Sequence, residues 1–281
     1  MKFALRARAL PLGADIGPEY VSLVYAERGR GSVAVRDCVT RTVPAAADTE
    51  LDLAIAQTLR TAVAALLSRE RRCVLAAPAS EIVHRTFRLP PGMRRREAER
   101  AAALEADTLA PWPASERVVA LDPIAGRDGE MLLSIARSSA VLRLASIASA
   151  GGLRPVAVDL PACAWRRAVP ETDAVLEYAR ERAQLVIFAD PVGTTHAFPP
   201  RVSDERLATL VRSALIEARR EGIADVRRLS VLGPAERTES LAASLHADGY
   251  AVVPVTCGTD VTAPWAFAYG LALWSAGAGG A

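Results

Sequence analysis

The order of predicted strands and helices repeats in the two halves of this 281-residue chain. Alternating apolar residues and intervening turn residues predict strands, then a helix, a strand and another helix in each half. Such a duplicated α/β unit favours two packed halves with a cleft between them. The predicted strands of the first half are 12–16, 20–26, 32–43, 73–77 and 153–160, around a helix at 51–67. Those of the second half are 174–178, 185–189, 194–198, 228–232 and 250–255, with helices at 203–221 and 235–248.

The stretch 88–124 interrupts the first half. Its Leu-Pro-Pro-Gly turn ends a strand, because proline cannot donate to a strand ladder. A helix over 94–109 follows, and Pro111 and Pro113 stop it with Trp112 held between them. A strand over 118–124, a strand over 131–136 and a helix over 138–150 complete an inserted subdomain at about 78–150. The apolar stripe predicted for the helix consists of Ala101, Leu104, Ala106 and Leu109.

Composition excludes several classes of function. The net charge of +2 gives no bulk electrostatic case for nucleic acid, and the basic run Arg94–Arg96 is offset by Glu97 and Glu99. No apolar run reaches the roughly 18 residues of a membrane span, and the first residues lack a signal-peptide core. We therefore expect a cytoplasmic protein. The cysteines show no C-x-x-C spacing, so we expect buried thiols and no metal site; they are Cys38, Cys73, Cys163 and Cys257.

No local pattern supports a catalytic centre. A catalytic histidine needs a nucleophile and an orienting carboxylate within hydrogen-bond reach, and no G-x-S-x-G or similar motif is present. The three histidines are therefore expected to be structural, and the helix carboxylates to form a solvated face. These residues are His84, His196 and His246, with Glu97, Glu99, Glu105 and Asp107.

The inserted stretch resembles a known family. The Leu-Pro turn, the helix carrying Leu104-Glu105-Ala106-Asp107 and the Pro-Trp-Pro elbow are similar to one subdomain of the PilM proteins of type IV pilus assembly. The segments 150–155 (AGGLRP) and Val158-Asp159 extend this resemblance. PilM is actin-like and related to the cytoplasmic domain of GspL-type secretion proteins. The resemblance implies an actin-like (ASKHA) duplicated fold, with a first half at 1–168 and a second half at 169–281 whose last helix packs back.

In actin-like ATPases, Asp-x-Gly turns approach the phosphates of ATP. Asp15-Ile16-Gly17 fits the first such turn, although the same triplet is also common in plain hairpins. The second turn is expected near Glu177, where Ala179 replaces the glycine. The adenosine turn corresponds to Gly233. The candidate nucleotide-site residues are therefore Asp15, Gly17, Glu177 and Gly233.

The sequence departs from the family at this site. Pro18 has no N–H, Glu19 adds negative charge, and Ser22 occupies the position of the family lysine. The chain passes from the helix at 203–221 almost directly to the strand at 228–232, so we expect the fourth subdomain of the family to be missing. No Walker A loop provides another phosphate site. The interpretation is a pseudo-ATPase that needs no cofactor, with ATP–Mg²⁺ binding through nonstandard residues as the alternative.

The resemblance then implies a function. By resemblance, the chain is a non-catalytic scaffold that binds the N-terminal peptide of a PilN-like inner-membrane protein, together with other pilus assembly components. By resemblance, the peptide groove lies between the first subdomain and the inserted one, near 85–110 and the neighbouring strands of the first half. Trp112 fits either a core position or this groove. The alternatives are an actin-like ATP-binding protein or ATPase, and the cytoplasmic domain of a secretion-type relative.

Overall fold

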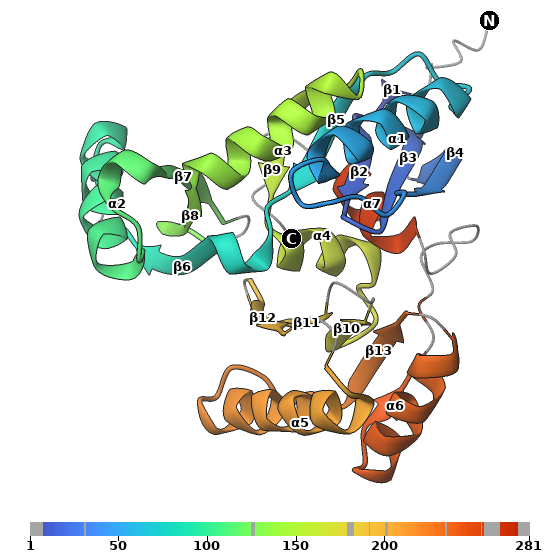
Figure 1. Cartoon of the computed structure of the whole chain (residues 1–281). Helices are drawn as coiled ribbons and strands as arrows, with labels where there is room; N and C mark the ends of the chain where they lie inside the picture. Colours follow the sequence, from blue (N-terminus) through green and yellow to red (C-terminus); the bar gives the residue numbers. More distant parts are fainter. Residues whose placement is uncertain are drawn as a thin grey trace, which may run out of the picture.

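The computed structural model describes residues 8–30, 32–90, 92–124, 127–178, 183–190, 192–199, 202–233, 235–253, 255 and 265–274. These residues form three sheets, of which two belong to the repeated halves and one to the insert within the first half (Figure 1). How the chain divides into independently folding units stays a prediction.

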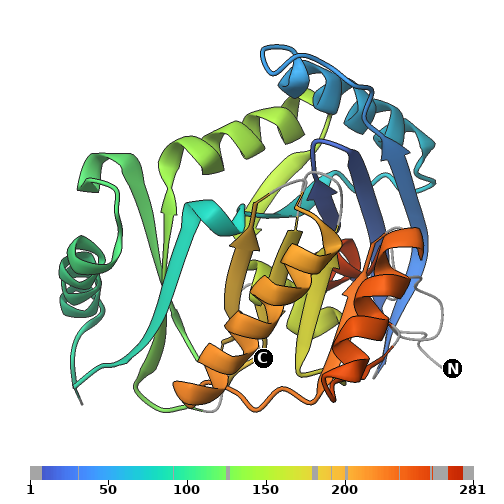
Figure 2. The ribbon, with the colours of Figure 1, turned by 60° about the horizontal axis from the view of Figure 1, so that its bottom comes forward.

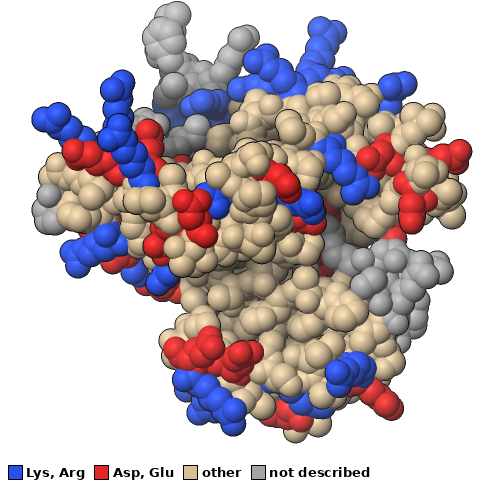
Figure 3. All heavy atoms as spheres, turned by 60° about the vertical axis from the view of Figure 1, so that its left-hand side comes forward, with Lys and Arg blue, Asp and Glu red and all other residues tan. Residues whose placement is uncertain are grey.

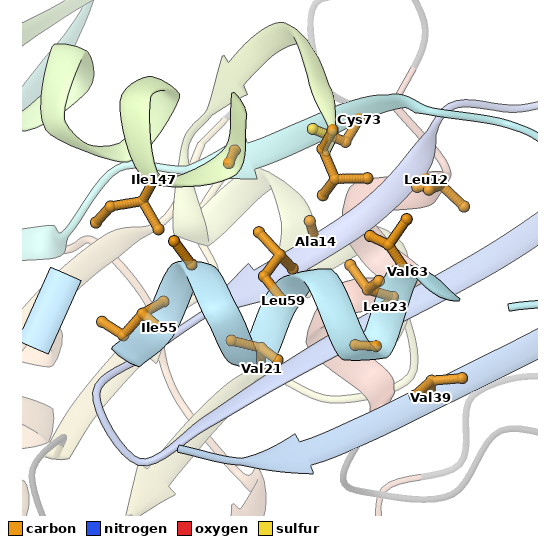
Figure 4. Close-up of a cluster of buried hydrophobic side chains, with 14 of the residues drawn as sticks. Leu12, Ala14, Val21, Leu23, Val39, Ile55, Leu59, Val63, Cys73 and Ile147 are labelled. Atoms are coloured by element: carbon orange, nitrogen blue, oxygen red, sulfur yellow. The ribbon is translucent and has the colours of Figure 1, made fainter. Parts of the chain in front are cut away.

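The first sheet has the spatial order β4-β3-β2-β5-β9, with β1 beside β2 on the same edge of β3. Its first three strands are antiparallel, and β2, β5 and β9 are parallel. Helices α1 and α3 cover one face, where Leu59 and Ile147 meet Ala14 and Leu23 in a buried apolar cluster (Figure 4). The elements are β1 Arg8–Ala9, β2 Leu12–Ile16, β3 Tyr20–Arg28, β4 Val33–Thr42, α1 Leu51–Ala65, β5 Arg72–Ala76, α3 Ser138–Ala150 and β9 Arg154–Asp159.

The second sheet repeats this topology. Its order is β12-β11-β10-β13-β14, again with three antiparallel strands followed by parallel ones. Helices α5 and α6 lie side by side on one face (Figure 2). The predicted duplication is confirmed. Neither residues 221–227, which separate α5 from β13, nor residues 199–203, which separate β12 from α5, are enough for a fourth subdomain. The elements are β10 Ala174–Tyr178, β11 Ala183–Ile187, β12 Thr194–Phe198, α5 Asp204–Arg220, β13 Arg228–Leu232, α6 Ala235–Ala247 and β14 Ala251–Val252.

Two helices are exchanged between the halves. Helix α4 (Pro161–Ala168) follows the first sheet but packs on the second, whereas α7 (Ala266–Ala272) follows the second sheet and packs on β2 and β3. Helix α7 lies close to both α4 and β2. A Cβ at Gly270 of α7 would lie 2.0 Å from the carbonyl oxygen of Ala164 in α4, and a Cβ at Gly13 of β2 would lie 1.7 Å from the carbonyl oxygen of Ala268 in α7. The last described helix thus packs back onto the first half.

The insert is a three-stranded antiparallel sheet with one helix on it. Helix α2 contacts the sheet through Ala102 and Ala106, whose small side chains at a spacing of four residues let the helix approach Leu133 and Ile135, and Leu109 packs beside them. The predicted stripe was wrong at Leu104, which is 70% exposed. The sheet order is β6-β8-β7, and the elements are the 3-10 turn η1 Ala79–Glu81, β6 Ile82–Arg88, α2 Arg95–Leu109, the 3-10 turn η2 Ala114–Glu116, β7 Arg117–Pro123 and β8 Glu130–Arg137.

Most predicted elements are present, and the differences lie at their ends. Helix α1 stops at Ala65 and leaves Leu67 89% exposed. Strand β14 is shorter than the predicted 250–255. Ser203 caps α5 as expected, because its hydroxyl oxygen accepts the Arg206 N–H at 3.3 Å. In the described part of the chain, no helix combines the length and apolarity that crossing a membrane requires.

Candidate functional site

A cavity of about 400 Å³ lies in the cleft between the two halves. Figure 3 shows the molecule hollowed between the upper body and the second half below it. The β2–β3 turn, the segment after β5 and the start of α4 form one wall, and β11 and β12 form the other. The polar or charged side chains among its lining residues are those of Asp15, Ser80 and Gln184.

Two of the four predicted nucleotide-site residues line this cavity, namely Asp15 and Gly17. Asp15 is 3% exposed on β2, and the Gly17 N–H donates to the Tyr20 carbonyl at 3.0 Å in the hairpin turn. A Cβ at Gly17 would lie at an ordinary contact distance, 3.4 Å, from the same carbonyl oxygen. The hairpin itself therefore does not require glycine at this position.

The other two predicted residues lie outside the lining. Glu177 is 5% exposed at the end of β10 and accepts two side-chain hydrogen bonds. The Tyr20 hydroxyl donates to one carboxylate oxygen at 3.1 Å, and the Gln184 amide donates to the other at 2.6 Å. Because Tyr20 belongs to the first half, its bond joins the β2–β3 hairpin to the β10–β11 hairpin, the two places where the sequence predicted phosphate turns. Sequence reasoning missed this link.

Gly233 has a structural explanation. It follows β13, and a Cβ there would lie 2.1 Å from the carbonyl oxygen of Tyr178, so the two backbones approach too closely for a side chain. Ala179, which replaces the glycine of the second predicted turn, lies outside the described residues.

Ser22, at the family lysine position, does not line the cavity. It is fully buried on β3, and its hydroxyl lies 2.7 Å from that of Thr40. The indole N–H of Trp265 donates to the same Thr40 oxygen at 2.7 Å. Position 22 therefore belongs to the packing of α7 on the first sheet.

A second groove, of about 470 Å³, opens between α1, α3 and η1. Its floor is apolar, with Leu51 and Ile55 from α1 and Leu144 and Ile147 from α3. The exposed side chains of Leu53 and Leu142 belong to the same two helices. The groove lies between the first subdomain and the inserted one, as expected, but none of residues 85–110 lines it. Which residues bind a partner stays a prediction. The groove and the cavity share the lining residues Ile16, Gly17, Pro18, Pro78, Ser80 and Leu144, so they are continuous.

The insert also touches the second half. The His84 ring donates from Nε2 to the Gly193 carbonyl, with 2.7 Å between the atoms. Burial lowers the pKa of this imidazole. Arg127, after β7, forms an ion pair with Asp190 of the second half. The insert is therefore held at two points beside the cleft.

The cysteines that the structure describes, Trp112 and the carboxylates of α2, which the sequence also offered as candidates, lie outside the cavity lining. Cys73 and Cys163 are buried, and burial raises the pKa of each thiol to about 12, which keeps both unreactive. Cys38 is half-buried, and Cys257 lies outside the described residues. Trp112 is half-buried, Glu105 pairs with Arg85, and Asp107 pairs with Arg117. Within the described ranges, no three His, Cys, Asp or Glu side chains are grouped to hold a metal ion.

The repeated sheets, the exchanged helices and the cleft define an actin-like protein. The family model described as type IV pilus assembly protein PilM matches residues 13–197, about two thirds of the sequence. The chain therefore belongs to the PilM family of type IV pilus assembly proteins. A search of curated protein sequences found no match.

Solved structures show the same fold. One described as the PilM–PilN type IV pilus biogenesis complex has 21% identity and a TM-score of 0.67, covering 95% of this chain and 98% of that one. The cytoplasmic domain of EpsL, an inner membrane component of the type II secretion system of Vibrio cholerae, has 13% identity and a TM-score of 0.51, covering 79% and 82%. The ethanolamine utilization protein EutJ from Carboxydothermus hydrogenoformans has 15% identity and a TM-score of 0.50, covering 97% and 92%.

Proposed function

We propose that this protein is a non-catalytic scaffold of type IV pilus assembly that binds the cytoplasmic segment of a PilN-like inner-membrane protein. In this proposal it lies at the cytoplasmic face of the inner membrane through that partner, and it also contacts other assembly components but no nucleic acid. The observation that carries the non-catalytic role is the link from Tyr20 to Glu177, which joins the two hairpins by a side-chain hydrogen bond.

The charge of the cavity supports the same view. ATP brings several negative charges, which proteins neutralise with Lys, Arg or a metal ion. Among the described residues that line the cavity, the one charged side chain is that of Asp15, and no Lys or Arg is present. Pro18 contributes no N–H to the turn. These features do not fit a triphosphate, so we propose that no cofactor is needed.

The groove between α1 and α3 is the proposed docking site. A solved relative is a PilM–PilN complex, and this chain covers nearly the whole length of that structure. The apolar floor suits a segment that buries Leu, Ile or Val side chains. Asp52 and Arg143 form an ion pair between the two helices, with oxygen–nitrogen distances of 2.6–3.0 Å, which fixes the width of the groove.

Calorimetric titration of the purified protein tests both parts of the proposal, the binding of the partner segment and the lack of ATP binding. One titrant is ATP–Mg²⁺, and the other is the cytoplasmic segment of the membrane protein encoded beside it. We expect binding of the segment and no binding of ATP, and millimolar ATP should not raise the melting temperature. Micromolar ATP affinity would instead support the alternative, an ATP-binding protein that uses Asp15, Gly17, Glu177 and Gly233.

A matched pair of variants locates the segment. Leu142→Glu places a charge beside the groove at a side chain that is 68% exposed, so the fold should tolerate it. We expect it to weaken segment binding at least tenfold. Ile216→Glu makes the same change on α5 of the second half, at a side chain that is 49% exposed. If both variants bind the segment as the unmodified protein does, the docking site lies elsewhere.

A further inference from the structure

The outer edge of β7 is an open edge of the insert's sheet. The order β6-β8-β7 gives β7 one neighbouring strand in the described part of the chain. Its Val118 and Val119 side chains are 44% and 41% exposed, although both are apolar. An edge strand presents a row of backbone N–H and C=O groups that can pair with another strand.

The hydrogen-bond pattern shows which groups point outward. The Ile124 N–H donates to the Glu130 carbonyl at 3.0 Å, and the two residues lie opposite each other in the register that pairs Pro123 with Met131. Backbone groups along a strand alternate in direction. The N–H and C=O groups of Val118, Ala120 and Asp122 therefore point toward β8, and those of Val119 and Leu121 point to the open edge.

The sequence of this edge differs from that of β4, the edge strand of the first sheet. Arg36, Asp37 and Arg41 place charges along β4, and such charges discourage the addition of another strand. In β7, the four residues between Arg117 and Asp122 are uncharged. The β7 edge therefore lacks the protection that β4 has.

The ends of the β7 edge are acidic. Glu116 is half-exposed and 3.8 Å from Arg137, and Asp122 is exposed and forms no ion pair with any residue that the structure describes. The Arg117 side chain is only 5% exposed, because it turns inward to Asp107 and donates to the Ala106 carbonyl at 2.9 Å. Negative charge at both ends suits a strand with basic residues at its own ends.

This charge pattern disfavours pairing with a second copy of the chain in the register centred on Val119. Two-fold antiparallel pairing of β7 with itself, centred on Val119, would place Glu116 opposite Asp122 at both ends. Like charges directly opposite each other destabilise a strand pair. A partner with basic ends avoids this repulsion.

We propose that the outer edge of β7 binds an extended segment of a partner protein, apolar in its centre and basic at both ends, as an added strand of the insert's sheet. This site is formed by other residues than the α1–α3 groove and does not rest on the pilus role. Main-chain hydrogen bonds to Val119 and Leu121 supply affinity, and the acidic ends set the preference for basic residues.

The test uses the full chain and a labelled peptide, acetyl-Lys-Val-Thr-Val-Thr-Val-Lys-amide, in fluorescence anisotropy. We expect saturable binding that weakens with added salt. Val119→Pro removes an N–H that points to the open edge and leaves the bonds to β8, so it should weaken binding at least tenfold. Val119→Lys places a charge at the same position, with Ile216→Lys on α5 as its matched control. A peptide with Glu in place of both Lys residues should bind more weakly than the Lys peptide.

Several outcomes would overturn the proposal. They are the absence of peptide binding to the unmodified protein, equal affinity of the unmodified protein and Val119→Pro, and equal affinity for the Lys and Glu peptides. Circular dichroism shows whether Val119→Pro is folded. If Val119→Pro is unfolded, Val119→Lys tests the proposal instead. This variant keeps the backbone N–H, but its positive charge should repel the basic peptide and lower the affinity at least tenfold. The control Ile216→Lys should bind the peptide as the unmodified protein does.

Discussion

The two halves share one topology, but their first hairpins have different positions relative to the cavity. In the first half, Asp15 and Gly17 of the β2–β3 hairpin line the cavity. In the second half, Glu177 at the end of β10 lies outside the lining and is hydrogen-bonded to Tyr20 and Gln184. The first half also carries the insert between β5 and α3, whereas in the second half α6 begins almost directly after β13, at Ala235. The two copies thus keep the same strand order in their sheets, whereas the surfaces available to ligands and partners differ between them.

The largest effect is expected where the halves are joined. Trp165 of α4 is 1% exposed, and its ring centroid lies 5.0 Å from that of Phe267 in α7. Trp165→Ala should lower the free energy of unfolding by about 3–5 kcal/mol, because it leaves a cavity between both sheets. Urea unfolding followed by circular dichroism measures this loss. A loss no larger than that of Trp112→Ala, at a half-buried site in the insert, would show that the halves are not joined through this cluster.

The link between the hairpins is expected to contribute less. A hydrogen bond to a charged group contributes about 1.5–3 kcal/mol, and removing one partner also leaves the other unsatisfied. In a double-mutant cycle, Tyr20→Phe and Glu177→Leu should therefore show a coupling energy of about 1.5–3 kcal/mol in urea unfolding. Tyr25→Phe, which removes a 2.8 Å bond to Glu27 within the first half, should show no coupling with Glu177→Leu. Equal coupling in both pairs would contradict a specific link.

The contact between the insert and the second half should respond to pH. Burial lowers the pKa of His84 in the folded protein, so the unfolded chain binds a proton that the folded chain resists. Stability should therefore fall as pH decreases through the unfolded value of about 6.5. Between pH 7.5 and 5.5, His84→Gln should lose less free energy of unfolding than the unmodified protein. The exposed His246, replaced by Gln, serves as the control, and the same pH slope for all three proteins would refute this role of His84.

The smallest effect concerns the outer face of α2. Leu104→Ser should change the free energy of unfolding by less than about 0.5 kcal/mol, since the side chain projects into solvent. Ala102→Leu, on the face that contacts the sheet, should cost about 1–3 kcal/mol by overpacking. Thermal unfolding of both variants compares the two faces. Equal losses would mean that the helix is oriented differently from the structure.

Much of the fold could be predicted because its signals are local. The turn residues around 174–178 and 194–198, and the break after Ala150, place element ends within the sequence itself. The face of α2 could not be chosen this way, since Leu104 and Leu109 are equally apolar. Leu109 packs on the sheet beside Ala106, whereas Leu104 is exposed. The short Asp-x-Gly motif singled out Asp15 and Gly17, and both line the cavity. Their role in binding nucleotide stays a prediction. The bonds between Tyr20 and Glu177 and between His84 and Gly193 join residues more than 100 positions apart, which no local pattern encodes.

The exchange of α4 and α7 has a consequence for synthesis on the ribosome. The surface of β2 around Gly13 is covered by α7, which is made about 100 residues after β9. At a translation rate of roughly 5–20 residues per second, α7 is synthesised on the order of 5–20 s after the last strand of the first sheet. Helix α4 is likewise finished before the second sheet on which it packs. The nascent chain therefore exposes apolar surface on one face of the first sheet until nearly the whole protein has been translated, which makes this face a natural binding site for a chaperone during that interval.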